Sequence, residues 1–322
     1  MAYTPEVLGT IGTGMDNERK VFYSKALLAR LVPALEHANH GLAEDIPPHA
    51  GKQIEKRRFE SYPVNIGTST LTEGTPPTAL NGTWTALVFT ISQYGAFSYL
   101  TDVLESQGFD GIDDMVNAFG EHAGNTIDQV IRDGIVAGST VYYAGGVAGR
   151  SLINTTNTLS STEVRKAVRK LRANNAKPFD DGYYHVIMHP DCEYDLQGDN
   201  LVQQVYFYNA ERGEDSPMIQ GSVPAIFGAK FYRTTNAKQF ANAGQSTGVN
   251  VYATLFLGRD AYLVSRFSTQ NVKTIIKAIG TSGIYDPLDQ AMTVGWKASV
   301  TAGILQNSAI VRVESAASQS GT

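Results

Sequence analysis

Cysteine is almost absent from this chain. Its 322 residues include a single cysteine, Cys192. One thiol cannot form an internal disulfide, so no disulfide framework can hold the fold together. We therefore expect a protein that folds in a reducing compartment or whose folding does not depend on redox state.

Charged residues are also scarce, at 18% of the chain against roughly 25% in typical soluble domains. The formal net charge is −5, whereas proteins that grip nucleic acid usually carry a basic face. Two basic runs exist, and neither is interleaved with aromatic residues that could stack on bases. We expect both to be solvated faces or to pair with protein carboxylates. They are Lys52–Arg58, beside Glu55 and Glu60, and the set Arg165, Lys166, Arg169, Lys170 and Arg172.

Long apolar runs and the common nucleotide-binding and hydrolase motifs are missing too. No stretch approaches the ~18 apolar residues of a membrane helix, and no basic region followed by an apolar core marks a signal peptide. The glycine-rich run Gly145–Ser151 has the wrong spacing for a phosphate-binding loop, and Arg150 stands where that loop needs lysine. Gly9, Gly12 and Gly14 precede any strand, which excludes a dinucleotide loop. There is also no Gly-x-Ser-x-Gly elbow. The absence of these motifs therefore gives little support for a catalytic function.

The best metal candidate is a group of ligand-type residues at His185, His189, Asp191 and Cys192. However, His185 falls inside an expected strand, where residues four apart are separated by about 13 Å. A metal-dependent hydrolase using His185, His189 and Asp191 is thus a minor alternative. Asp110, Asp113 and Asp114 form an acidic cluster at the start of a long helix, where capping is a sufficient role and calcium binding a weaker one.

What the sequence does contain is an unusual stretch from Pro47 to Thr90. Polar turns, basic residues and short strand-like pieces alternate in it, and no helical period is visible. Alternation at Tyr62, Val64 and Ile66, and the run from Trp84 to Ile91, predict strands. Because a two-stranded ribbon alone in water is marginal, this segment should lie against something outside its own domain. The stretch therefore predicts a chain that joins copies of itself.

The clearest single element is an amphipathic helix over residues 111–137. Its apolar residues recur every three or four positions, as a helix of about 3.6 residues per turn requires. They are Ile112, Val116, Phe119, Ala123, Ile127, Val130, Ile131 and Ile135. Glycines four apart, at 120 and 124, suggest a bend or a close backbone contact. Other expected helices span 16–38, 99–107, 161–174 and 190–196. Expected strands span 184–188, 225–234, 249–258, 261–266, 272–279, 291–304 and 309–315.

Along the chain, an arm is followed by a long extended loop, a long helix and a β-rich closing region. In this order of elements the chain resembles the major capsid protein of tailed bacteriophages, whose fold is the Johnson fold of the Hong Kong phage type. Several stretches carry the resemblance: LTEGTPP at 71–77, VIMHPDCEYDL at 186–196, FGAKFYRTTNA at 227–237, LFLGRDAY at 255–262, and DPLDQAMTVGWKASVTAGILQNSAIVRVES at 286–315. These stretches occur in the order typical of the family, and the resemblance spans nearly the whole chain.

The resemblance implies an α+β fold with a defined layout. Residues 1–47 would form the N-terminal arm and 48–98 the E-loop. Residues 99–181 and 266–322 would form the peripheral domain, with its spine helix at 111–137, and 182–265 the axial domain. Some members cross-link covalently from the E-loop; Lys52 and Lys56 lie in the right region, but no partner asparagine is identifiable.

The function implied is structural rather than enzymatic. Copies would form pentamers and hexamers of an icosahedral head that encloses double-stranded DNA without sequence-specific binding. No cofactor is expected. Implied partners are a separate scaffolding protein, a portal and possibly a decoration protein; assembly in the host cytoplasm and a final location in the virion follow. An encapsulin-type nanocompartment shell is the alternative with the same fold.

Overall fold

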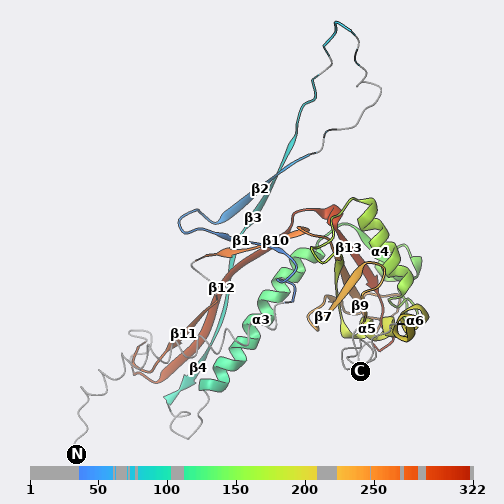
Figure 1. Cartoon of the computed structure of the whole chain (residues 1–322). Coiled ribbons are helices and arrows are strands. Elements are labelled where there is room, and N and C mark those ends of the chain that lie inside the picture. Colours follow the sequence, from blue (N-terminus) through green and yellow to red (C-terminus); the bar gives the residue numbers. More distant parts are fainter. Residues whose placement is uncertain are drawn as a thin grey trace, which may run out of the picture.

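The structure of the protein is a computed structural model (Figure 1). It describes residues 36–60, 62, 71, 73–76, 79–102, 112–208, 223–246, 248–268, 272–281 and 288–319. The predicted helix at 16–38 lies almost wholly outside these residues. Within them, helices and β-sheets form two packed bodies and one projecting ribbon, which confirms the predicted mixed α+β class.

The first body is a five-stranded sheet covered by one long helix. Strand β12 (Ala291–Ile304) is central to it and pairs antiparallel with β4 (Ser92–Thr101), β10 (Tyr262–Phe267) and β11 (Lys273–Lys277). Strand β1 (Leu42–Ile46) adds to β10 in parallel. Alternate residues of β12, from Val294 to Val300, are buried toward the helix, as the two-residue period of a strand requires.

That helix, α3 (Ile112–Val136), confirms the predicted spine helix. Its predicted apolar stripe is the core: Val116, Ala123, Ile127, Ile131 and Ile135 are all buried against the sheet. A Cβ on Gly134 would come within 2.8 Å of the carbonyl oxygen of Ala302. Glycine therefore lets the helix backbone approach β12 closely.

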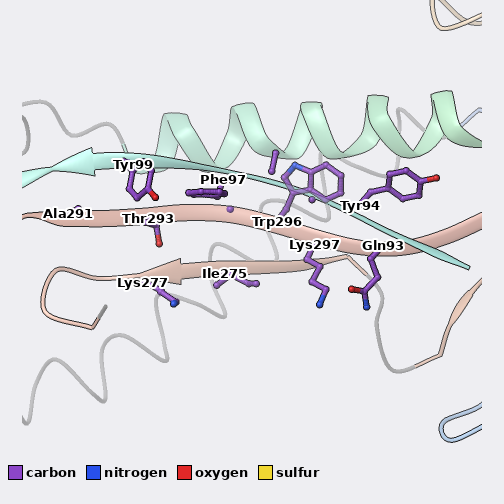
Figure 2. Close-up of a pocket in the computed structure, with 13 residues that line it drawn as sticks. Gln93, Tyr94, Phe97, Tyr99, Ile275, Lys277, Ala291, Thr293, Trp296 and Lys297 are labelled. Carbon is purple, nitrogen blue, oxygen red and sulfur yellow. The ribbon is translucent and has the colours of Figure 1, made fainter. Parts of the chain in front are cut away.

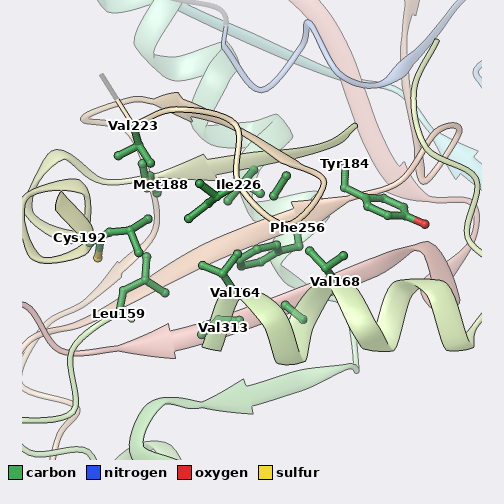
Figure 3. Packing of buried hydrophobic residues seen from close by; sticks show 14 of the residues in the cluster. Leu159, Val164, Val168, Tyr184, Met188, Cys192, Val223, Ile226, Phe256 and Val313 are labelled. Atoms are coloured by element: carbon green, nitrogen blue, oxygen red, sulfur yellow. The ribbon is translucent and has the colours of Figure 1, made fainter. Parts of the chain in front are cut away.

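The second body is a six-stranded sheet with helices packed on it. The strand order is β5 (Val141–Tyr143), β13 (Ile310–Ser315), β9 (Val251–Leu257), β6 (Tyr184–Met188) and β7 (Ala229–Arg233), and β8 (Gln239–Phe240) pairs with β9. The helices are α4 (Ser161–Ala173), α5 (Pro190–Gln197) and α6 (Asn200–Tyr208). Val164 and Val168 of α4 pack with Phe256 of β9 and Val313 of β13 (Figure 3). Short 3-10 turns occur at Ala144–Gly146, Arg150–Leu152 and Asn307–Ala309.

The third part is a ribbon of two antiparallel strands, β2 (Gln53–Phe59) and β3 (Trp84–Thr90). It projects away from both bodies (Figure 1). The predicted strand from Trp84 is confirmed. Tyr62 lies outside any strand, and Val64 and Ile66 lie outside the described residues.

One predicted helix needs correction, and the sheets group the chain differently from the predicted domains. The predicted helix at 99–107 is wrong at its start, because Tyr99–Thr101 continue β4 and pair with β12. The rest of that segment, 103–107, lies outside the described residues. The domain boundaries stay a prediction, but the sheets group the chain differently from them: β5 and β13 belong with β6 and β9, because β13 pairs with both β5 and β9.

Candidate assembly interface

The β2–β3 ribbon buries none of its own side chains. Along both strands, half-exposed residues alternate with exposed ones. At its far end Phe59 packs edge-on against Tyr62 and Trp84, with ring centroids 5.4 and 4.8 Å apart. These rings remain 40%, 48% and 66% exposed, respectively. A ribbon with no core and an exposed aromatic cluster is a surface that needs a partner.

One side of the ribbon is nevertheless fixed to its own subunit. The guanidinium of Arg58 donates a hydrogen bond to the carbonyl oxygen of Leu305, at 3.2 Å. The ring of Phe89 lies where a side chain on Gly303 would be, only 2.2 Å from the position of an added Cβ. The direction of the ribbon is therefore set by its own body, while its aromatic end stays uncovered.

The basic run on the ribbon is neutralised within the chain. Lys56 pairs with Glu44 of β1, and Arg57 pairs with Glu55 at 2.8 Å. Arg58 pairs with Glu60 at 2.7 Å. Hydrogen bonds from Arg58 and Thr85 hold the pKa of Glu60 below its ordinary value. This supports the expectation of protein charge pairing, with the carboxylates supplied by the same subunit.

The chain beyond the ribbon turns at Glu73–Gly74. Gly74 has φ of +81°, in the left-handed region that favours glycine. Nothing lies within 4 Å of a Cβ placed there. The turn therefore depends on the glycine backbone and not on packing against the body.

The face of the five-stranded sheet opposite α3 carries a second uncovered surface (Figure 2). Phe97 and Tyr99 of β4 are 63% and 64% exposed and pack edge-to-face at 5.2 Å. Beside them Gly95 and Gly295 leave a shallow hollow of about 670 Å³, which lysines at 277 and 297 also line. Exposed apolar patches of this kind mark interaction surfaces.

The residues considered as metal ligands are held apart in separate hydrogen bonds. His185 Nε2 lies 3.0 Å from Asp181 Oδ2, and His185 Nδ1 lies 3.0 Å from His40 Nδ1. His189 accepts from the backbone N–H of Asp191 at 3.2 Å, capping α5. Within the described residues, no group of three or more His, Cys, Asp or Glu side chains could hold a metal ion.

The other two members of that set have structural roles. Asp191 accepts a hydrogen bond from the hydroxyl of Tyr252 at 2.7 Å. Cys192 is fully buried, and burial raises the pKa of its thiol to about 12. Burial also lowers the pKa of His189, although Asp191 opposes that shift. This arrangement does not support the hydrolase alternative. The side chains of Asp110, Asp113 and Asp114 lie outside the described residues.

His122 has a packing role. The indole N–H of Trp296 donates to His122 Nδ1 at 3.1 Å, which links α3 to β12.

A buried anchor, which no sequence pattern predicted, joins residues 36–40 to the spine helix. Asp128 of α3 accepts from the backbone N–H of His37 and pairs with His37 Nδ1, both at 2.9 Å. The hydroxyl of Tyr262 donates to the carbonyl oxygen of His37. His37 and Asp128 are both completely buried. The partners are 91 positions apart, so no local pattern could have paired them.

The ribbon, the long helix on a five-stranded sheet and the separate six-stranded body together define the subunit fold of a phage capsid shell. A family model described as Phage capsid protein matches residues 84–313. The chain therefore belongs to the phage capsid protein family, and it is a major capsid protein.

Solved structures share this fold at low sequence identity. The Cyanophage Pam1 capsid matches with a TM-score of 0.67 and 14% identity, covering 90% of this chain and 92% of that one. The capsid of Ralstonia phage GP4 matches with a TM-score of 0.65 and 12% identity, covering 88% and 92%. The head structure of Helicobacter pylori bacteriophage KHP40 matches with a TM-score of 0.63 and 12% identity, covering 85% of this chain and 87% of that one. No curated protein sequence matches the chain. No helix in the described part of the chain is long and apolar enough to cross a membrane.

Proposed function

We propose that copies of this chain close an icosahedral head shell by laying the β2–β3 ribbon on a neighbouring copy. One observation carries this proposal: an ordered ribbon with no buried side chains ends in the exposed cluster of Phe59, Tyr62 and Trp84. Contacts in a closed shell are heterologous, so a reaching element on one copy must meet a different surface on the next.

The aromatic cluster is large enough to contribute substantially to such a contact. Covering the exposed halves of three aromatic side chains removes on the order of 300 Å² from water. At about 25 cal/mol per Å² this corresponds to roughly 7 kcal/mol, before the costs of association are subtracted. The hollow beside Phe97 and Tyr99 is a second apolar surface available to a neighbour.

In this proposal the predicted domains are regrouped according to the two sheets of the structure. The five-stranded sheet with α3 would be the peripheral domain, and the six-stranded sheet with α4, α5 and α6 the axial domain around the capsomer axis. The ribbon and its loop would be the E-loop, continuous with an arm that ends at the His37–Asp128 anchor. Pentamers and hexamers would form the head around double-stranded DNA.

The role is structural and non-enzymatic. The net charge of −5 suits a shell that encloses DNA without binding it tightly. A separate scaffolding protein, a portal and possibly a decoration protein would complete assembly in the host cytoplasm, and the mature protein would reside in the virion. An encapsulin-type shell is disfavoured because the matching family model is that of phage capsid proteins.

Electron microscopy of the expressed chain tests this function, with Trp84→Ser as the informative variant. The wild-type chain should form closed shells, alone or with its scaffold, and Trp84→Ser should yield folded, soluble subunits with few shells. Leu152→Ser, at an exposed apolar position on the six-stranded body, is the matched control and should assemble. Persistent monomers of the wild-type chain under all conditions would contradict the function.

A further inference from the structure

Helix α4 presents three exposed arginines on one side. Arg165, Arg169 and Arg172 are four and three residues apart, which places them within about 60° of one another around the helix. All three are exposed. By contrast, Lys166 on the same helix pairs with Glu163 at 2.9 Å. Among the described residues, no carboxylate lies within ion-pair distance of any of the three arginines. This row is therefore unlike the neutralised basic run of the ribbon.

A strained turn places an aromatic ring beside these arginines. Ile226 and Ala229 exchange backbone hydrogen bonds of 3.1 and 2.9 Å around Phe227 and Gly228, whose φ values are +54° and +85°. A left-handed conformation at a non-glycine residue costs about 1–2 kcal/mol. Such strain persists where the surroundings impose it, often at functional sites.

The arginines hold this turn in place and form a hollow with it. The guanidinium of Arg165 lies 5.6 Å from the Phe227 ring centroid, and Arg172 Nη2 donates to the Phe227 carbonyl oxygen at 3.4 Å. The ring remains 40% exposed. Together with Arg169 and Val168 these side chains line a hollow of about 380 Å³. The hollow is cationic with one aromatic wall, hence suited to an anionic surface that also carries apolar atoms.

A complementary hollow lies beyond the other end of α4. It has a volume of about 540 Å³ and is lined by Asp195, Asp199 and the 59%-exposed ring of Tyr194, with no lysine or arginine among its lining residues. Asp195 Oδ2 accepts from the backbone N–H of Ser318 at 3.0 Å. Asp195 Oδ1 also accepts from the hydroxyl of Ser318, so this carboxylate is fixed in position.

The second carboxylate is held ionised by backbone groups. Asp199 accepts from the N–H groups of Ser161 and Leu201, both at 2.9 Å. Burial alone would raise the pKa of Asp199, but these hydrogen bonds outweigh it and lower the pKa below its ordinary value.

The two hollows cannot meet within one subunit. Ser160, the N-cap of α4, lines the acidic hollow, whereas Arg172 lies in the last turn of the helix. A helix of 13 residues spans about 20 Å. Figure 3 shows α4 running past the core with Leu159 near one end and Tyr184 near the other. Opposite charges at opposite ends of one element favour a head-to-tail contact between copies, which closes into a ring when the rotation permits.

We infer that Arg165, Arg169 and Arg172 of one copy dock into the Asp195–Asp199 hollow of a second copy, and that this contact repeats around each capsomer. The inference rests on the proposed function, since it names a contact within the shell. Arginine forms bidentate bonds with carboxylates, and Phe227 and Tyr194 supply apolar area beside the charges. A second copy fits better than a nucleic acid because the same chain carries the matching anionic hollow.

A charge-swap experiment tests the contact in the full-length protein. Arg169→Asp should lower the yield of closed shells about tenfold or more, because it sets like charges against each other. Asp195→Arg should do the same. The double variant carrying both changes should assemble again, since every contact in a head-to-tail ring then has opposite charges. The control is Lys177→Asp, which makes the same change in charge at an exposed lysine just beyond the helix. The yield of closed shells from this variant should stay near that of the wild type.

Chemical cross-linking gives a readout that does not depend on shell formation. A chain carrying Arg169→Cys and Asp195→Cys, treated with a short bismaleimide, should give ladders of covalently joined subunits, whereas each single variant should not. The native Cys192 is buried and should not react.

The outcomes separate this inference from the proposed function. Shells without ladders, or full assembly of Arg169→Asp, would overturn the inference and leave the function standing. Absence of both shells and ladders would overturn both. Normal shells of Arg169→Asp with reduced DNA content would overturn the contact in favour of a phosphate-binding surface.

Discussion

The buried contact between His37 and Asp128 leads to the most specific prediction about the stability of the subunit. Asp128→Ala removes an acceptor that is completely buried and that receives two hydrogen bonds of 2.9 Å, from the backbone N–H and the Nδ1 of His37. Both side chains are completely buried, so both groups of His37 would be left without a partner.

The expected cost follows from these contacts. Each buried polar group left unsatisfied costs about 1–3 kcal/mol, and Asp128→Ala leaves two such groups on His37. We therefore expect Asp128→Ala to lower the free energy of unfolding by about 2–6 kcal/mol. Asp128→Asn keeps one carbonyl acceptor and should cost less.

Urea unfolding of the purified subunit, followed by tryptophan fluorescence, measures this difference. Trp296 reports on the core because it is 2% exposed and lies between β12 and α3. The matched control is Asp133→Ala on the same helix, whose side chain is 51% exposed and pairs with Arg132 and Lys238. Exposed pairs contribute about 1 kcal/mol or less. Equal stabilities of the two variants would refute the reasoning, as would a double-mutant cycle with His37→Ala that shows no coupling.

Three further outcomes follow from positions already described. Gly74→Val should impair shell assembly more than subunit folding, because it forces a β-branched residue to φ of +81° where the body makes no contact; equal loss of subunit solubility would count against this. Ile127→Asp should abolish folding, because it places an unpaired charge at a core position that is 7% exposed, and a normal melting curve would show the reasoning to be wrong. Burial, with His185 and further cations nearby, lowers the pKa of His40 to about 4 from 6.5. The subunit should therefore keep its full stability above pH 6.5 and lose about 3 kcal/mol as the pH falls toward 4. Unfolding at several pH values should show a flatter profile for His40→Phe, and an unchanged profile would exclude His40 as the cause.

Helices and strands whose apolar residues recur at a regular spacing could be predicted from the sequence. The stripe from Val116 to Ile135 specifies a helix and its buried face, because residues three and four apart share one side. Strand β12 alternates along its buried stretch in the same readable way. The ribbon was predictable from its lack of a core, since Trp84–Thr90 carries strand-forming residues with nothing nearby to bury them against.

Elements defined by distant partners could not be read in this way. Tyr99–Thr101 looked like the start of a helix, but pairing with β12 makes them the end of a strand, so tertiary contact overrides local preference. The His37–Asp128 anchor joins residues 91 apart in the sequence. Likewise, β13 pairs with β5 and β9 from far along the chain.

The two basic runs illustrate the same limit at the candidate interface. In sequence they look equivalent, and both were expected to pair with carboxylates or face solvent. In the structure, cross-strand and neighbouring glutamates neutralise Lys56, Arg57 and Arg58. The arginines of α4 lack such partners among the described residues because the helix turns them outward. Only the fold distinguishes a neutralised basic surface from one available to another copy.

The most direct test of the account is a cryo-electron microscopy reconstruction of the assembled particles. We predict that the β2–β3 ribbon of each copy lies on a neighbouring copy, with Phe59, Tyr62 and Trp84 covered by that neighbour. A shell in which these three rings remain exposed to solvent, or pack only on their own subunit, would contradict it.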